Sequence, residues 1–250
     1  MNILITGHKG LIGSHLFREL SKYHNVSGID LYDCDYNNKT KKYDVIIHCA
    51  AHCLIREVIK TPGLALENIN STFSTLELAK IHKAKFIYFS SSRVEHNQHN
   101  PYIASKRAGE ELVKAYAKCY GIEYIIIRPE TVWGRTNDNY KRVIPQWIET
   151  IKNNRVVTIY GDKNKQLSPI HVEDFVEIFI EVLENFNTYK GQEISISGRI
   201  LKAVNIVKMI GKFYNRTPKI RFKPAEKTQP QRCNNADFIS NMTFMEQLRR

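Results

Sequence analysis

The first half of the chain alternates continuous apolar runs with segments of helical periodicity, and this alternation constrains the fold more than any other feature. The apolar runs lie at residues 1–7, 25–30, 43–51, 85–92 and 123–129, and helical patterns occupy 11–23, 64–82 and 101–120. Strands that are covered by helices on both faces read as continuous apolar runs, because neither side of such a sheet meets water. The sequence therefore predicts an α/β fold built on a parallel sheet.

The second half of the chain is less regular. Helices are expected at 143–153, 173–186 and 203–215, with strands at "VVTIYG" and at 193–197. Residues 31–43 read as polar and turn-like, and the tail beyond Pro218 has little periodicity. We therefore expect a second, smaller part that is built differently from the sheet.

Composition limits the classes of partner and the location. With 250 residues, 42% of them hydrophobic, the chain can form one large domain or two small ones that share a core. The formal net charge is +12, but the basic residues are dispersed and do not interleave with aromatics, so we expect no nucleic-acid partner. No run of 18 apolar residues occurs, which predicts no membrane span. The start "MNILITG" lacks the layout of a signal peptide, and this favours the cytoplasm.

The cysteines give no sign of a disulfide framework or a metal site. There are five of them, an odd number, and no C-x-x-C spacing occurs. We expect reduced and mostly buried thiols, and no metal ligands.

A glycine-rich turn follows the first expected strand. Gly7, Gly10 and Gly13 stand three residues apart in "TGHKGLIGSHL", between the strand and a helix. Such glycines permit a tight turn, a close approach of backbone amides to a pyrophosphate, and close packing of helix on strand. Asp30 ends the next strand, where a carboxylate can accept hydrogen bonds from ribose hydroxyls and repel a 2′-phosphate. This favours NAD as a cofactor, although a turn without ligand and a turn-capping Asp30 are alternatives.

A second polar motif lies in "NPYIASKRAGEELV". Tyr102 and Lys106 are one helical turn apart, behind the capping candidates Asn100 and Pro101. Gly121 is the expected end of this helix. A cation beside a tyrosine lowers its pKa by favouring the phenolate, as a general base needs. Any solvated helix face can also carry such a pair, so the spacing by itself leaves both interpretations open.

The motifs together resemble the extended short-chain dehydrogenase/reductases, and within them the NAD-dependent epimerase/dehydratase family that acts on nucleotide sugars. The resemblance implies a Rossmann-like, doubly wound parallel sheet that binds NAD, and a smaller C-terminal part that binds a nucleoside-diphosphate sugar. The expected domains are 1–128 with 171–197 for NAD and 129–170 with 198–250 for substrate. The blocks that carry the resemblance are "TGHKGLIGSHL", "DVIIHCAAH", "ENINSTFSTLELAK", "FIYFSSSRV", "PYIASKRAGEELV", "IIIRPETVWG", "SPIHVEDFVE" and, more weakly, "NNADFISN".

The resemblance also implies roles for individual residues. The catalytic residues would be Ser91, Tyr102 and Lys106, with Ser90 and Ser92 as register alternatives for the serine. The residues implied in cofactor binding are Gly7, His8, Gly10, Leu11, Ile12, Gly13, Asp30, Leu31, Ala50, Ala51, Asn68, Tyr102, Lys106 and Pro129. Those considered for substrate binding are His52, Ser92, Thr131, Lys227 and Arg232.

Several positions depart from the family pattern. Ser92 and Arg93 stand where family dehydratases carry an acidic pair, which argues against a 4,6-dehydratase. Thr131 replaces a frequent Asn, and Leu167 replaces an Arg that commonly meets the diphosphate. Lys227 and Arg232 would supply that charge or form solvated surface. The segment before "DVIIHCAA" is short, so one strand–helix unit is expected to have shrunk or disappeared.

Three hypotheses follow for the function. The first is an NAD-dependent nucleotide-sugar epimerase, the second a 4-keto-sugar reductase or sugar-nucleotide dehydrogenase, and the third a non-catalytic NAD-binding module. The resemblance also suggests a homodimer through the helices at 64–82 and 101–120, whose apolar residues would equally suit the core. Asp174 opens the helix at 173–186, where an acid suits the positive helix end. His171 is expected to be packed or hydrogen-bonded rather than a ligand, and Trp133 to pack rather than to stack on a base.

Overall fold

A seven-stranded sheet organises the chain, in the order β13-β10-β5-β4-β3-β1-β2. The computed structural model describes residues 1–30, 42–96, 98–134, 142–225 and 233–250. The sheet confirms the expected α/β, Rossmann-like class, since β1 pairs in parallel with β2 and β3, and β4 with β3 and β5. Its strands are β1 (Asn2–Thr6), β2 (Asn25–Ile29), β3 (Val45–His48), β4 (Lys85–Phe89), β5 (Tyr124–Pro129), β10 (Glu193–Ser197) and β13 (Phe238–Ile239).

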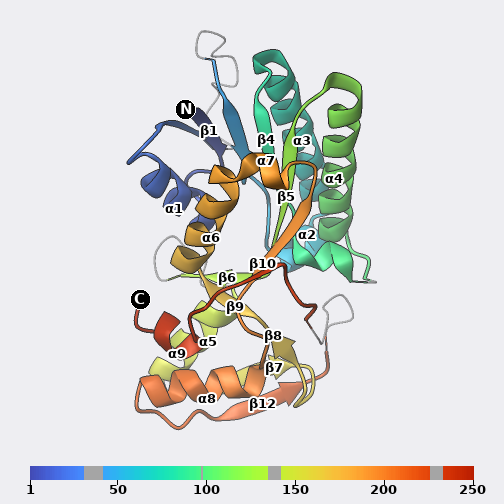
Figure 1. Cartoon of the computed structure of the whole chain (residues 1–250). Coiled ribbons are helices and arrows are strands. Elements are labelled where there is room, and N and C mark those ends of the chain that lie inside the picture. The colour runs from blue at the N-terminus through green and yellow to red at the C-terminus, as the bar shows by residue number, and fades with distance from the viewer. Residues whose placement is uncertain (31–41, 97, 135–141, 226–232) are drawn as a thin grey trace. The chain divides into compact units, whose positions relative to one another are not determined.

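Helices connect successive strands of this sheet. Helix α1 (Leu11–Leu20) joins β1 to β2, and α4 (Pro101–Tyr120) joins β4 to β5. Between β3 and β4 the chain forms α2 (Ile55–Lys60), which was not expected, and α3 (Gly63–His82). Figure 1 shows α3 and α4 side by side on one face of the sheet and α1 on the other. The expected loss of a strand–helix unit falls on residues 31–41, outside the described residues.

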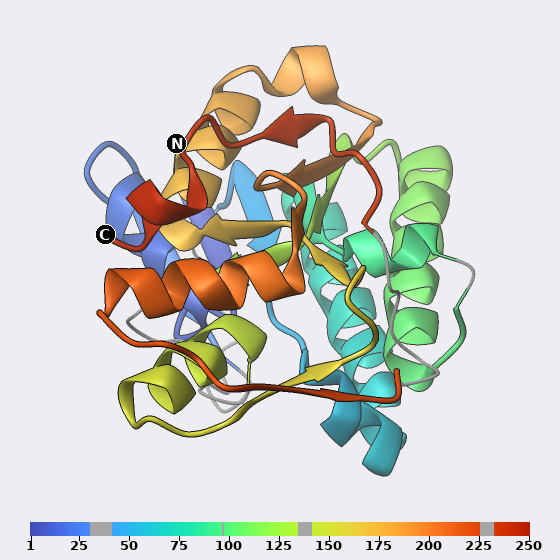
Figure 2. The same cartoon turned by 90° about the horizontal axis from the view of Figure 1, so that it is seen from below.

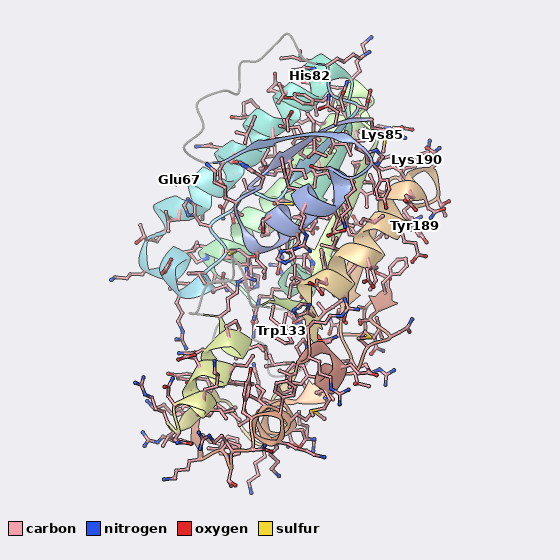
Figure 3. All side chains as sticks on the ribbon, turned by 90° about the vertical axis from the view of Figure 1, so that its left-hand side faces the viewer. Glu67, His82, Lys85, Trp133, Tyr189 and Lys190 are labelled. Atoms are coloured by element: carbon pink, nitrogen blue, oxygen red, sulfur yellow. The ribbon has the colours of Figure 1, made fainter. Side chains whose placement is uncertain are left out.

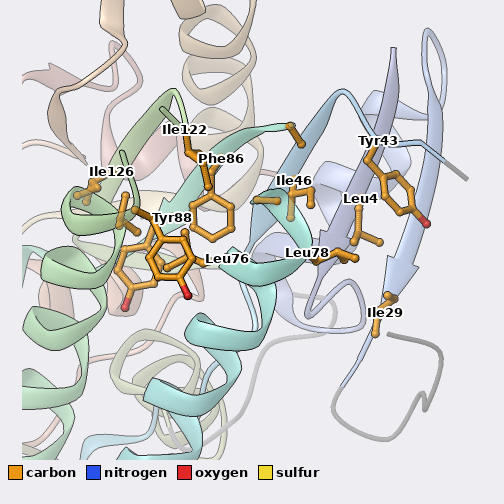
Figure 4. Close-up of a cluster of buried hydrophobic side chains, with 14 residues drawn as sticks. Leu4, Ile29, Tyr43, Ile46, Leu76, Leu78, Phe86, Tyr88, Ile122 and Ile126 are labelled. Carbon is orange, nitrogen blue, oxygen red and sulfur yellow. The ribbon is translucent and has the colours of Figure 1, made fainter. Parts of the chain in front are cut away.

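The buried cluster between the sheet and α3 explains why these segments pack. Leu4, Ile46 and Phe86 project from three neighbouring strands and are fully buried. Leu76 and Leu78 of α3 close over them (Figure 4). Burying each such side chain contributes about 1.5–3 kcal/mol, so the apolar runs specify which face of α3 turns inward.

The chain divides into two compact units. The first unit comprises Met1–Arg128 with Phe179–Ile194, and the second comprises Pro129–Ile178 with Ser195–Arg250. The division runs through α6 (Val172–Glu184), while α7 (Phe186–Tyr189) belongs to the first unit. The functional domain limits expected from the sequence stay a prediction.

The second unit combines helices with short two-stranded sheets. Helix α8 (Ala203–Phe213) contacts α5 (Val143–Lys152) and β7 (Val157–Tyr160) (Figure 2). Strand β7 pairs in parallel with β12 (Ile220–Lys223). The remaining elements are β6 (Thr131–Trp133), β8 (Gln166–Leu167), β9 (Pro169–His171), β11 (Leu201–Lys202) and α9 (Phe244–Gln247). The described residues of the tail beyond Pro218 are therefore more structured than its weak periodicity suggested.

Trp133 and His171 are packed, and Asp174 lies at the start of its helix, as the sequence predicted. Trp133 is 1% exposed and meets the His171 ring edge-on, with ring centroids 5.0 Å apart. Asp174, in the first turn of α6, accepts a hydrogen bond from Ser240 and pairs with Arg250 at 2.9 Å. Burial raises the pKa of this carboxyl, and the Arg250 charge opposes that rise.

One expectation about the cysteines was wrong. Cys53 and Cys119 are exposed, and Cys49 and Cys233 are half-buried. Both exposed thiols lie on surfaces that the apolar pattern did not mark, Cys53 just before α2 and Cys119 in the last turn of α4. Among the helices of the described ranges, none is both long and apolar enough to cross a membrane.

Candidate active site

The carboxyl ends of three adjacent parallel strands place most of the expected site residues of the first unit along one edge of the sheet. Thr6 at the end of β1 is in register with His48 at the end of β3, and His48 with Tyr88 in β4. The segments that follow these strands are the glycine turn, residues 49–53 and "SSSR" at 90–93. Ligands of open α/β sheets bind at this edge, so the location suits a cofactor and a substrate.

The glycine turn leaves no room for side chains at two positions. Gly7 has φ +72°, and a Cβ there would lie 2.8 Å from the backbone of Ala50. A Cβ on Gly13 would lie 2.1 Å from the carbonyl oxygen of Gly7. Gly10 caps α1 without a side-chain hydrogen bond, so the first turn of the helix presents backbone N–H groups. This cradle fits the pyrophosphate of a dinucleotide.

Asp30 lies beside this turn, as expected from its position after β2. Its Oδ2 accepts a hydrogen bond from the backbone N–H of Lys9 at 3.2 Å. The His8 ring lies against β2, where a Cβ on Gly28 would be 2.3 Å from its Cγ. Leu11 is buried and Ile12 half-buried in the first turn of α1, and Leu31 lies outside the described residues.

Tyr102 and Lys106 are buried, which answers the question that their spacing left open. Tyr102 is 7% exposed and packs with Val58, Ala65 and Ile103, and Lys106 is 5% exposed. The Nζ of Lys106 donates to the carbonyl oxygen of Phe89 at 2.8 Å. Burial lowers the pKa of this ammonium group to about 8. The pair therefore does not belong to a solvated helix face.

Local capping sets the helical position of the pair. The Oδ1 of Asn100 accepts from the N–H of Ile103 at 3.0 Å, and Pro101 stands in the first turn. Gly121 ends α4 with φ +69°. These caps confirm the predictions from the sequence, and they place Tyr102 in the first turn with Lys106 one turn later.

Ser91 lies at the carboxyl end of β4, in the same unit as the pair. It is 7% exposed, and its Oγ accepts from the N–H of Arg93 at 3.3 Å, which caps the short helix η1 (Ser92–Glu95). Ser92 is also buried, as the first residue of η1. Of the described residues between Ser91 and Tyr102, those of η1 form the one helical turn before α4.

Asn68 joins the segment after β3 to α4. Its Oδ1 accepts from the N–H of His52 at 2.7 Å, and its Nδ2 donates to the His52 carbonyl and to Ser105 Oγ. The His52 ring lies 2.8 Å from Glu67 Oε2. Figure 3 shows Glu67 near one end of α3, with His82 at the other. Ala50 and Ala51 belong to the backbone that Asn68 helps to hold.

Sequence reasoning missed two arginines that hold the η1 segment. Arg107 Nη2 donates to the carbonyl oxygens of Val94 and His96, each at 2.9 Å. Arg128 donates to both carboxylate oxygens of Glu110, from Nε at 2.9 Å and from Nη2 at 2.8 Å. Its Nη1 donates to Glu95 Oε1 at 3.3 Å. The hydrogen bond to Glu110, reinforced by the Glu110 charge, raises the pKa of Arg128. Arg107 and Glu110 stand in "SKRAGEE", which resembles any exposed polar helix surface. Only the contacts therefore reveal that the arginines hold the η1 segment.

The remaining expected residues lie in the second unit or outside the described ranges. Pro129 ends β5, and Thr131 begins β6 and is half-buried. Leu167 is buried in β8, opposite Leu201. Lys227 and Arg232 lie outside the described residues, so their expected contribution to substrate binding stays a prediction.

A family comparison agrees with this arrangement. The model of the NAD dependent epimerase/dehydratase family matches residues 3–197. That is more than half of the chain, and the chain belongs to this family. Its cofactor is NAD, and the cradle of Gly7 and Gly13 beside Asp30 stays the predicted site for it. When bound, NAD accepts a hydride from a carbon that bears a hydroxyl group and can return it.

Individual relatives support the same class. A putative UDP-glucose 4-epimerase of Methanocaldococcus jannaschii is 28% identical over 78% of this chain and 79% of its own length. The dTDP-D-glucose 4,6-dehydratase of Homo sapiens is 26% identical over 82% of this chain and 74% of its own. The chain is thus similar to enzymes with two different outcomes, and these similarities define a nucleotide-sugar-modifying class rather than one reaction.

Solved structures share the fold. A UDP-glucose 4-epimerase of Thermotoga maritima, crystallised with UDP-glucose, aligns with a TM-score of 0.87 at 19% identity, over 99% of this chain and 96% of that one. A UDP-glucuronic acid 4-epimerase of Bacillus cereus, crystallised with its nucleotide sugar and NAD, aligns with a TM-score of 0.83 at 24% identity, over 92% and 88%.

Proposed function

We propose that this protein is an NAD-dependent nucleotide-sugar epimerase. It would oxidise one sugar hydroxyl to a transient ketone, and hydride would return to the opposite face of the same carbon. The substrate would be a nucleoside-diphosphate sugar, as the names of the relatives and of the solved structures suggest. The observation that supports this best is the burial of Tyr102 and Lys106 next to the strand end that carries Ser91.

Each of the three residues has a distinct role in this proposal. Tyr102 Oη takes the proton of the reacting hydroxyl as its carbon loses hydride, and returns it at the end of the cycle. Ser91 Oγ holds the same oxygen by a hydrogen bond. Lys106, a cation one helical turn from Tyr102, favours the phenolate over the phenol and so keeps the base usable near neutral pH.

Purified protein and a panel of nucleotide sugars test the proposal. An epimerase interconverts two sugars without added NAD, because the cofactor is regenerated in place and stays bound. NAD should therefore appear in the supernatant only after denaturation. Turnover that consumes added NADH would identify the reductase or dehydrogenase instead. Bound NAD without turnover on any sugar would favour the non-catalytic module.

We also propose a homodimer through α3 and α4. Leu66, Phe73 and Ile81 of α3 and Tyr120 of α4 are 48–63% exposed, an apolar surface that a second copy would cover. Light scattering coupled to gel filtration measures the mass directly. A dimer that dissociates in Phe73→Asp, and persists in the control Lys83→Asp, would support this interface.

A further inference from the structure

Arg93 is an arginine that is only partly exposed, and among the described residues no carboxylate forms an ion pair with it. Its Nη1 is buried, and no hydrogen-bond acceptor lies within reach of it in the described part of the chain. Arginine keeps its charge at every physiological pH, so it cannot avoid the cost of burial by losing a proton. A buried guanidinium nitrogen without an acceptor is costly, and this indicates that a ligand supplies one.

Three cations near the η1 segment already have acceptors among the described residues. Lys106 donates to the Phe89 carbonyl, Arg107 to the Val94 and His96 carbonyls, and Arg128 to Glu95 and Glu110. Ser90, three residues before Arg93, also has a buried Oγ without a partner. Two groups that can donate hydrogen bonds therefore remain available within "SSSR", at the carboxyl end of β4.

The position of Arg93 limits which anion it can meet. The cradle for the NAD pyrophosphate follows β1, and β3 lies between β1 and β4 in the sheet. Arg93 is two residues from Ser91, which in the proposed function holds the reacting hydroxyl of the sugar. An anion near Arg93 would thus be attached to the sugar ring itself, closer to the reacting carbon than the diphosphate.

We propose that Arg93 binds a carboxylate on the sugar, so that the preferred substrate is a nucleoside-diphosphate hexuronic acid. The inference rests on the proposed function for the identity of the substrate class. A planar guanidinium matches a carboxylate with two parallel hydrogen bonds, and charge-assisted bonds of this kind are stronger than those to a neutral hydroxymethyl group. Ser90 would donate a further bond to the same group.

A matched pair of ligands tests this assignment. UDP-glucose and UDP-glucuronic acid differ only in the group on C5 of the sugar, and UDP alone retains the diphosphate without the sugar. Their dissociation constants are measured by calorimetry on the NAD-loaded, full-length protein in a Tyr102→Phe background, so that binding is read without turnover. Arg93→Met keeps much of the side-chain volume, Arg93→Lys keeps the charge, and Arg18→Met is a control at an arginine that is 55% exposed.

We expect the parent protein to bind UDP-glucuronic acid about ten- to a hundredfold more tightly than UDP-glucose, as a charged hydrogen bond implies. Arg93→Met should abolish this preference with little effect on the affinity for UDP-glucose or UDP. Arg93→Lys should retain part of the preference, and Arg18→Met all of it.

Equal affinities for the two sugars in the parent protein, or an equal loss of affinity for UDP in Arg93→Met, would overturn the assignment. If Arg93→Met unfolds, the parent preference and Arg93→Lys still decide. If UDP-glucuronic acid binds preferentially but the protein that retains Tyr102 does not turn it over, only the proposed epimerase activity would be refuted.

Discussion

The Nζ of Lys106 donates a hydrogen bond to the carbonyl oxygen of Phe89 at 2.8 Å, and this contact joins α4 to the end of β4. The ammonium group also lies 5.2 Å from the centroid of the Tyr88 ring, a cation–π distance. Phe89 stands two residues before Ser91. One buried cation therefore links the helix that carries Tyr102 to the strand end that carries the proposed serine.

The depressed pKa of Lys106 predicts a pH dependence of stability. The pKa rises from about 8 in the folded protein to 10.5 when the chain unfolds, so between these values the unfolded state binds more protons. Stability contributed by this group must then increase with pH across that window, by about 3 kcal/mol in total. Below pH 8 both states are charged and the full burial penalty applies.

Lys106→Met lacks this titration and serves as the reference. In urea denaturation of NAD-free protein, the free energy of unfolding of wild type minus that of Lys106→Met should increase by about 3 kcal/mol from pH 7.5 to 10.5. Subtraction removes the titration of other groups. Parallel pH profiles for the two proteins would mean that Lys106 is not desolvated.

Removal of the Tyr102 hydroxyl should abolish the proposed proton transfer. We expect Tyr102→Phe to lower turnover about 10²–10⁴-fold, the usual contribution of a general base, while NAD remains bound. The control Tyr23→Phe, at a tyrosine that is 82% exposed, should keep wild-type turnover. Full activity in Tyr102→Phe on a confirmed substrate would refute the mechanism.

Two Gly→Ala variants separate the phosphate cradle from ordinary helix propensity. A Cβ on Gly13 would lie 2.1 Å from the Gly7 carbonyl oxygen, whereas at Gly63 nothing lies within 4 Å. Gly13→Ala should cost about 1–3 kcal/mol of stability by overpacking and should weaken NAD binding. Gly63→Ala should be neutral or slightly stabilising. Thermal melts and the NAD content of the purified proteins measure both effects, and unimpaired NAD binding in Gly13→Ala would contradict the cradle.

The ion pair of Arg128 and Glu110 should matter more than surface pairs. The two side chains are 18% and 6% exposed, so Arg128→Met leaves a buried carboxylate without its cation. We expect a loss of about 3–5 kcal/mol, and recovery of most of it in Arg128→Met/Glu110→Met. Lys190→Met breaks the exposed pair with Glu123 and should cost less than about 1 kcal/mol. Equal losses in the two single variants, measured by urea denaturation, would argue against the buried network.

The sequence by itself determined the features that depend on near neighbours. The alternation of apolar runs and helical patterns defined the parallel sheet, and Asn100 and Gly121 marked the ends of α4 because capping involves residues only a few positions apart. The glycine turn could likewise be recognised, since its spacing within one strand–turn–helix unit reflects steric needs of the backbone, and Asp30 could be recognised from its place at the end of the next strand.

Only the tertiary structure decided which polar residues are buried and paired. Tyr102 and Lys106 have the spacing of any solvated pair, and their burial depends on α2, α3 and β4 packing around α4. Arg128 reaches Glu110 across 18 positions, and β12 pairs with β7 across a still longer separation. Such contacts arise when distant segments fold together, and no local periodicity encodes them. The unpartnered guanidinium of Arg93 became visible for the same reason, because only the folded chain shows which acceptors lie within its reach.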